Sequence, residues 1–257
     1  MTTEANRKTY SAGATVWQEL TASSADGLDG FYRQVLGWDL LLDGDTGVFT
    51  LDGVPVAGLR IDPAAGPAEA GWKVFLGTGD VPGAVERAVA AGAVVVQDQV
   101  ALAGVAGSAV VLREPEGPLF GIASVAPEEA SVPSPEPGRL ALVDVMSHDL
   151  PAATAFQQAL FPQNGIEHVE DELSIFRDAQ GAPLRGVNAI HEEMKAVLPP
   201  HWLAWFVVAD QAKAAETALA AGGGVNVQDQ PIAFGRWAVV TDPSGAAFKA
   251  LELDREI

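Results

Sequence analysis

The chain of 257 residues contains no cysteine, which excludes disulfide bonds, thiolate metal sites and cysteine nucleophiles. The absence of disulfides fits a reducing compartment, and we expect a cytoplasmic protein. No apolar run approaches the roughly 20 residues that a helix needs to cross a bilayer. Residues 1–13 lack the apolar stretch of a signal peptide, so we interpret them as a flexible N-terminus.

Basic residues are scarce, because 15 lysines and arginines stand against 34 acidic residues, and the formal net charge is -19. Such a field repels phosphate backbones and anionic lipid surfaces. We therefore expect no nucleic-acid partner and no membrane partner.

Motifs for phosphate binding and for serine nucleophiles are missing as well. The sequence has no Walker or dinucleotide fingerprint and no G-x-S-x-G. The four histidines all lie in the second half, and no two have the spacing of three or four residues that places two ligands on one helix face. A histidine metal site is therefore not expected.

What the chain does contain is an internal repeat, which fixes the architecture. Residues 72–80 match residues 202–210, and each stretch is followed by an alanine-rich run, the triplet Gln-Asp-Gln and a turn of the type Glu-Pro-Glu-Gly or Asp-Pro-Ser-Gly. Residues 54–58 likewise match residues 182–186. The repeated unit is about a quarter of the chain.

A stretch rich in proline, glutamate and serine, residues 126–138, divides the chain and has almost nothing to bury. We predict a linker there, between a first domain at residues 14–125 and a second domain at residues 139–257. Each domain holds two repeat units, so a cleft needs no second chain. We expect a monomer or a homodimer.

Within each unit the hydrophobic period changes from two to 3.6 and back. In the first unit this predicts a strand at residues 15–20, a helix at residues 24–36 capped by Ser23 or Ser24, and three further strands. The other three helices are predicted near residues 81–91, 150–160 and 211–221. The order strand, helix, strand, strand, strand predicts an α+β fold, with helices on one face of mainly antiparallel sheets.

Four such units, opening with VWQELTASSADGLDGFYRQVLGW and closing with DPSGAAFKALEL, resemble the vicinal oxygen chelate superfamily of glyoxalase I, extradiol dioxygenases and bleomycin-resistance proteins. The W-x-E-L signature at residues 17–20 is similar to that of two-domain actinobacterial glyoxalase-like proteins often labelled hydroxylase. The resemblance implies two glyoxalase-like domains of paired βαβββ units, each with a concave mixed sheet that encloses a cleft where the chemistry takes place.

The same resemblance implies where a metal would be held. Metal-using relatives place one ligand on the first strand of each unit and a glutamate on the last strand. The corresponding positions in this sequence are Trp17, Lys73, Leu142 and Leu203 on first strands, and near Gly121 and Lys249 on last strands. None offers the imidazole or carboxylate that a divalent cation prefers. We therefore predict no metal and no cofactor.

Glu19 and Asp144 are the candidate catalytic residues. Residues two apart on a strand share a face, so Glu19 should follow Trp17, and Asp144 should follow Leu142, to the concave side. A partly desolvated carboxylate has a raised pKa and can move protons without a metal. The alternative is that each carboxylate only accepts hydrogen bonds from a neighbouring loop or tryptophan indole.

Trp17, Trp205 and Trp237 are the candidate ligand-binding residues. Trp205 should share the face of Leu203, and Trp237 takes the place of Ala109 in the repeat. Aromatic rings on a concave wall are typical of a site for a flat apolar ligand. Ordinary core filling is the alternative.

These patterns predict a metal-independent protein that binds a small apolar or aromatic organic molecule and carries out acid–base tailoring of a secondary metabolite. Glu19, and after it Asp144, is the expected acid or base. The alternative is a non-catalytic protein that sequesters a drug or metabolite. A third interpretation makes one half a scaffold, and the divergence of the third unit, with Gln157 in place of Tyr32, points to the second half.

Overall fold

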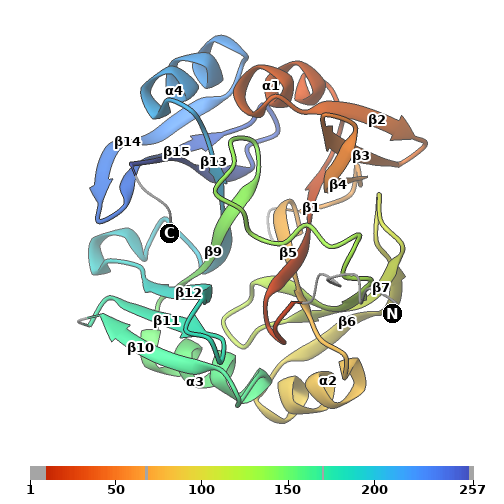
Figure 1. The fold of residues 1–257 in the computed structure, drawn as a ribbon, viewed down its shortest axis with the longest axis vertical. Helices are drawn as coiled ribbons and strands as arrows, with labels where there is room; N and C mark the ends of the chain where they lie inside the picture. Colours follow the sequence, from red (N-terminus) through yellow and green to blue (C-terminus); the bar gives the residue numbers. More distant parts are fainter. Residues whose placement is uncertain (1–9, 67–68, 170, 255–257) are drawn as a thin grey trace, which may run out of the picture.

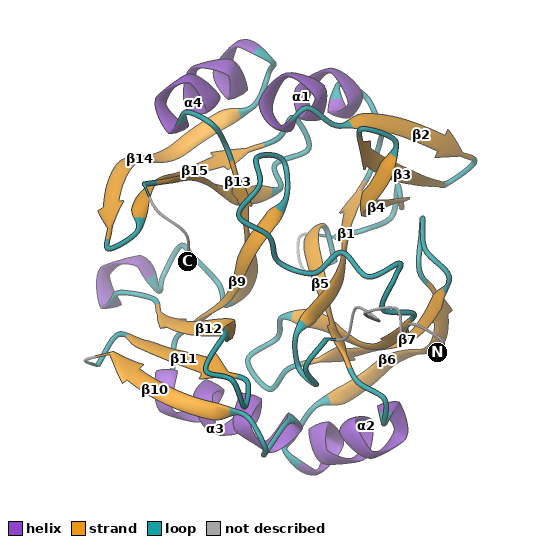
Figure 2. Cartoon of the chain, viewed as in Figure 1, coloured by secondary structure: helices purple, strands orange, loops and turns teal. Residues whose placement is uncertain are grey.

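The structure, a computed structural model, describes residues 10–66, 69–169 and 171–254. Within these ranges the chain forms two eight-stranded sheets, and Figures 1 and 2 show that one comes from each half of the chain. The first sheet contains β1 (Thr15–Ala22), β2 (Asp39–Asp43), β3 (Thr46–Leu51), β4 (Val54–Ile61), β5 (Gly71–Gly77), β6 (Val94–Ala101), β7 (Gly107–Arg113) and β8 (Leu119–Val125). The second contains β9 (Leu140–Ser147), β10 (Gly165–Val169), β11 (Leu173–Arg177), β12 (Pro183–Ala189), β13 (His201–Val207), β14 (Gly224–Ile232), β15 (Gly235–Thr241) and β16 (Ala247–Leu253).

In the described part of the chain, four α-helices and one short 3-10 helix accompany the sheets. They are α1 (Leu28–Leu36), α2 (Val81–Ala90), α3 (Leu150–Leu160), α4 (Gln211–Ala220) and the 3-10 helix Glu192–Met194. Within the described ranges, no helix combines the length and the apolar character that crossing a membrane requires. The predicted order of strand, helix, strand, strand, strand occurs four times, and the predicted α+β fold is confirmed.

In each sheet the first strands of the two units lie side by side at the centre. β1 pairs with β5 antiparallel and with β4 parallel, and β9 pairs in the same way with β13 and β12. Both sheets are therefore mixed. This pairing brings the side chains of β1 and β5, or of β9 and β13, together on one face.

The helices lie close to their predicted positions, except at the start of the first. The sequence predicted a helix from residue 24, but α1 begins at Leu28 after Gly27, whose φ of 77° is left-handed. The Oγ of Ser24 accepts a hydrogen bond from the backbone N–H of Asp26 at 3.0 Å. The predicted capping serine therefore stabilises a turn that precedes the helix, and the helix itself has no side-chain cap.

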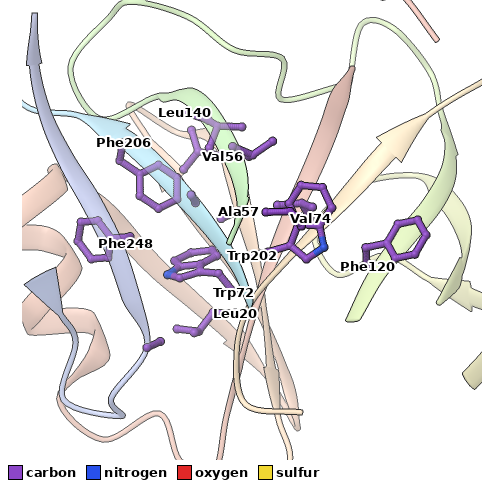
Figure 3. Packing of buried hydrophobic residues seen from close by; sticks show 14 of the residues in the cluster. Leu20, Val56, Ala57, Trp72, Val74, Phe120, Leu140, Trp202, Phe206 and Phe248 are labelled. Atoms are coloured by element: carbon purple, nitrogen blue, oxygen red, sulfur yellow. The ribbon is translucent and has the colours of Figure 1, made fainter. Parts of the chain in front are cut away.

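The helix-bearing faces of the two sheets meet in one hydrophobic core. Helices pack across the halves, α1 against α4 and α2 against α3, as Figure 1 shows. Between them, Trp72 of the first half lies 5.1 Å from Phe206 of the second, ring centre to ring centre, and Phe248 lies 5.4 Å from Phe206 (Figure 3). The core is therefore continuous between the halves, and neither sheet buries its helix face alone.

Two corresponding polar contacts also cross between the halves. The hydroxyl of Tyr32 on α1 donates to Oδ2 of Asp242, in the turn before β16, at 2.8 Å. The amide of Gln157 on α3 donates to Oε1 of Glu114, in the turn before β8, at 3.3 Å, and the indole N–H of Trp202 donates to the same oxygen at 2.8 Å. The Gln157 that replaces tyrosine in the third unit therefore keeps the inter-half contact.

Glu114 is part of a buried charged network that includes Arg185 on β12. The Nε of Arg185 donates to Oε1 of Gln157 at 2.8 Å, and its other nitrogens reach the carbonyl of Gly13 and the side chain of Asn164 at 3.1 Å. Burial raises the pKa of Glu114 to about 8 and lowers the pKa of Arg185 to about 9, while the attraction between the two groups opposes both shifts.

Replacing Glu114 by Gln should remove a pH dependence of stability. The carboxyl has a pKa of about 8 in the fold and an ordinary pKa of 4.5, so the folded state holds a proton that the unfolded state releases. Its contribution to the free energy of unfolding is full below pH 4.5 and falls as the pH rises toward 8. Thermal unfolding at pH 5, 7 and 9 should therefore show a wild-type Tm that declines relative to the Tm of Glu114→Gln.

The matched control is Glu86→Gln, at an exposed position of α2. This variant should follow the wild-type profile. Parallel pH profiles for Glu114→Gln and the wild type would contradict the role assigned to Glu114.

Candidate functional site

The concave face of the second sheet borders a cavity of about 770 Å³. Its lining includes Leu142 and Asp144 on β9, Asn188 on β12, Trp205 on β13, Trp237 on β15 and Lys249 on β16. Apolar side chains from β11 and from the end of β14 complete the walls. The volume lies within the range of about 300–1,000 Å³ that is usual for small-molecule sites.

Strand register explains why these residues meet. Trp205 lies directly opposite Leu142 on one side and Lys249 on the other, and Leu203 lies opposite Asp144. Residues that are paired across a ladder, or two apart along a strand, share a face of the sheet. Trp237 joins the same face from β15, where it pairs with Leu251.

Asp144 is the acidic group of this cavity, and it is buried. Its Oδ2 accepts a hydrogen bond from the indole N–H of Trp205 at 2.7 Å and one from the ammonium of Lys249 at 3.2 Å. Desolvation of a carboxylate is costly unless it is paired and hydrogen-bonded, and both conditions are met here.

Lys249 is held between two aromatic rings. Its Nζ lies 3.7 Å from the ring centre of Trp205 and 4.5 Å from that of Trp237, and the residue is 6% exposed. The ring faces attract the cation. Burial lowers the pKa of Lys249, and the carboxylate of Asp144 counteracts this shift.

A glycine on the neighbouring parallel strand makes room for the carboxylate. Gly186 pairs with Asp144, and a Cβ at Gly186 would lie only 2.3 Å from Oδ1 of that aspartate. In the first half Gly58 pairs with Glu19, and a Cβ there would lie 2.9 Å from Cγ of the glutamate. At Gly58 the carbonyl oxygen of Ala103 would lie closer still, at 2.7 Å, so an added side chain would crowd the carboxylate at Gly186 and both the carboxylate and the loop at Gly58.

The first half has the same carboxylate but no open cleft around it. Glu19 is 2% exposed and Trp17 is fully buried. The backbone N–H of Ala103 donates to Oε1 of Glu19 at 2.7 Å, and Arg60 lies 3.5 Å from Oε2. Burial raises the pKa of Glu19, and the N–H of Ala103 and the charge of Arg60 oppose that shift. The sequence-based alternative, a carboxylate that accepts hydrogen bonds from a loop, describes this geometry.

The loop that fills the first cleft is longer than its counterpart. Residues 102–106 connect β6 to β7, whereas only residues 233–234 connect β14 to β15. Leu102 packs with Trp17 and Phe75 in a cluster separate from the main core. Three extra residues therefore place protein where the second half has a cavity.

The floor of the first cleft also differs. Gly121 stands where the second half has Lys249, because Phe75 pairs with Gly121 as Trp205 pairs with Lys249. A Cβ at Gly121 would lie 2.1 Å from the ring of Phe75, so that ring lies directly over the glycine. The first half thus lacks a cation at the position of Lys249, and its buried ammonium is instead that of Lys73, which lies opposite Glu19 on β5.

The structure therefore brings Asp144, Trp205 and Trp237 together in one cavity and places Glu19 and Trp17 in the interior of the first half. The interpretation of the second half as scaffold does not fit this geometry, because the open concave cavity lies there. Sequence reasoning counted Lys249 only as a position unsuited to metal binding. Lys249 aligns with the position at which metal-using relatives place a ligand on the last strand, and this alignment was the signal that it faces the cavity.

The donor set of this cavity does not fit a divalent cation. Asp144 is the sole carboxylate among the residues described as lining it, and that group already accepts hydrogen bonds from an ammonium and an indole. Across the described ranges, no cluster of three or more histidine, aspartate or glutamate side chains has the geometry to hold a metal ion. Divalent metals in proteins take several imidazole or carboxylate ligands, and an adjacent ammonium opposes their charge.

Comparison with known proteins supports the fold and indicates related sequences. Residues 15–123 match the family model of a glyoxalase-like domain. "Putative glyoxylase CFP32" of Mycobacterium tuberculosis is 28% identical, over 96% of this chain and 97% of its own length. "Anthracycline biosynthesis protein DnrV" of Streptomyces peucetius is 27% identical, over 95% of this chain and 94% of its own length.

A solved structure shares the architecture. The Mn(II)-bound glyoxalase from Novosphingobium aromaticivorans superposes with a TM-score of 0.68, over 96% of this chain and 84% of that chain. At 14% sequence identity, this likeness concerns the fold alone.

The loop that fills the first cleft should be sensitive to a single methyl group. Gly104 has a φ of 88°, and a Cβ there would lie 2.5 Å from Cγ2 of Val48. Gly104→Ala should therefore lower the free energy of unfolding by about 2–5 kcal/mol, from left-handed backbone strain together with overpacking. Gly44→Ala is the control, because Gly44 has a φ of 60° but open space around it. Urea denaturation should show a loss of only about 1–2 kcal/mol for the control, and equal losses would argue against a tightly filled cleft.

Proposed function

We propose that the cavity of the second half binds a small aromatic molecule and carries out metal-independent acid–base tailoring of a secondary metabolite. The match of residues 15–123 to a glyoxalase-like domain, and the vicinal oxygen chelate fold of both halves, support this proposal. The observation that carries this proposal is the pair of Asp144 and Lys249 on the floor of an aromatic cavity.

The walls support the binding of a flat ligand. Trp237 is only half-buried, and Phe234 and Ile232 beside it are also partly exposed. Aromatic ligands gain from offset or edge contacts with such rings in addition to the area that they bury. Trp205, in contrast, is 5% exposed and serves chiefly to hold the carboxylate and the ammonium.

The floor supports proton transfer. Asp144 is the proposed base, and its Oδ1 lies over Gly186 while Oδ2 accepts both hydrogen bonds. Lys249 and Trp205 hold the carboxylate in position through these two hydrogen bonds. A positioned carboxylate of this kind typically contributes about 10²–10⁴-fold to a proton transfer.

The relatives support the metabolic setting. The name of the Streptomyces peucetius relative places that protein in anthracycline biosynthesis, and the match extends over nearly the whole of both chains. From this relative we take only the class of ligand for the proposal, which is a polycyclic aromatic secondary metabolite.

A protein that sequesters such a molecule without changing it is the second candidate. The low exposure of Asp144 favours it, because a base must reach the substrate proton. Binding alone needs the aromatic walls and not the carboxylate.

Asp144→Asn separates the two functions. A base removes a proton that exchanges with solvent, so the wild-type protein in D₂O should introduce deuterium into an aromatic metabolite extracted from its own host, detected by mass spectrometry. Asp144→Asn should slow this exchange by about 10²–10⁴-fold and leave binding of the metabolite unchanged.

Glu19→Gln is the matched control, because it makes the same chemical change at the equivalent position of the first half. Gln keeps an acceptor for the N–H of Ala103, and exchange should continue at the wild-type rate. Exchange lost in Glu19→Gln but not in Asp144→Asn would move the site to the first half. No exchange by the wild-type protein, despite binding, would establish sequestration.

Trp237→Ala should weaken binding of 2-methoxyanthraquinone, a flat neutral probe, by tenfold or more, which corresponds to about 1.4 kcal/mol. Tryptophan fluorescence quenching measures the affinity. Trp17→Phe is the comparison, because Trp17 is buried in the first half and its indole nitrogen has no hydrogen-bond partner among the described residues. Its affinity should equal that of the wild type, and a similar loss in both variants would place the probe elsewhere.

A further inference from the structure

The ammonium of Lys249 has unused hydrogen-bonding capacity in the direction of the cavity. An ammonium carries three N–H donors, and among the described residues one hydrogen bond is recorded, to Asp144 at 3.2 Å. The aromatic faces of Trp205 and Trp237 attract the charge but offer no lone pair as a full acceptor. A ligand oxygen in the cavity is a suitable acceptor for the other N–H donors of this cation.

The other cations near the cavity are already engaged. Arg177 donates through Nε to Oε2 of Glu167 at 2.7 Å. Arg185 directs its guanidinium to Gln157, Asn164 and Gly13, away from the concave face. Lys249 is therefore the positive group of the cavity floor, and its single carboxylate partner is shared with the indole of Trp205.

From these contacts we infer that Lys249 is a fixed cation that binds the ionised phenolic or enolic oxygen of an aromatic ligand. The inference rests on the proposed binding function and specifies its ligand class. A flat ring that packs against Trp237 beside the ammonium presents its edge to Nζ, which lies 4.5 Å from the centre of that indole. An oxygen attached to the ring edge is therefore the acceptor that this geometry reaches.

The charge of the floor selects a weak, singly charged oxyanion. A phosphate dianion would bring two negative charges to the carboxylate of Asp144 next to the ammonium, and it is repelled more strongly than a singly charged oxygen. A phenolic or enolic hydroxyl instead enters neutral and releases its proton to solvent on binding. No bond other than O–H is broken, and the ammonium stabilises the resulting negative oxygen as a preorganised charge does in an oxyanion site.

Two probes that differ in one methyl group test the inference with the full chain. 2-Hydroxyanthraquinone can ionise and 2-methoxyanthraquinone cannot, while both present the same ring system to Trp237. The wild-type protein should bind the hydroxy probe at least tenfold more tightly than the methoxy probe at neutral pH. Visible absorption should show the bound hydroxy probe as the phenolate, with its apparent pKa lowered by about one unit, since a tenfold change in affinity corresponds to one pKa unit.

Lys249→Met keeps the length and apolar stem of the side chain and removes the charge. This variant should lose both the tenfold preference for the hydroxy probe over the methoxy probe and the phenolate spectrum. Lys249→Arg, which keeps a cation, should retain part of the preference. The comparison of the two probes on the wild-type protein stands by itself if a variant does not fold.

The outcomes separate this inference from the function on which it rests. Equal affinity for both probes, with the hydroxy probe bound as the neutral phenol, would overturn the fixed-cation role and leave aromatic binding intact. Failure of the wild type to bind either probe up to its solubility limit would overturn both.

Discussion

A buried carboxylate that lies across a glycine of the neighbouring strand determines the rest of each concave face. Such a group must be given donors, because an unpaired buried charge is among the most costly features that a fold can contain. Glu19 receives the backbone N–H of Ala103 together with Arg60, whereas Asp144 receives the ammonium of Lys249. In the first half the loop that supplies one of the donors also fills the cleft, whereas in the second half the donors to Asp144 are side chains of the sheet and the cleft stays open.

Strand β13 contributes one face to the floor of the cavity and the opposite face to the core between the halves. On β13, Trp202 and Phe206 point into the shared core, while Leu203 and Trp205 point to the concave side. The hydrogen bond from Trp202 to Glu114 ties that strand to the first half. The ligand-facing indole is consequently positioned by packing against the other half, and the first half supports the site although its own cleft is filled.

The fold and part of the site could be predicted from the sequence, for different physical reasons. Periodicity and the repeat specify four units, because each unit buries one stripe of each helix and one face of each strand. The same alternation placed Asp144 and Trp205 on the concave side, and the repeat singled out Trp237 as an aromatic residue in the place of Ala109. It could not distinguish the two halves, since whether a cleft is open depends on the path of residues 102–106 and not on strand pattern. Lys249 was visible as a departure from the metal-binding pattern, but its partners depend on the register of β13 against β16.

The filled first cleft has the character of an internal complex. Residues 102–106 make the contacts that a bound ligand would make: they pack apolar atoms against Trp17 and donate one hydrogen bond to Glu19. Unlike a ligand, they are part of the same polypeptide chain. This segment cannot dissociate as a ligand does. In a duplicated chain of this kind, one half can therefore stay filled and serve as a rigid support, while the other half binds and releases its ligand. The longer hairpin and the Phe75 ring over Gly121 together distinguish the filled half from the open half.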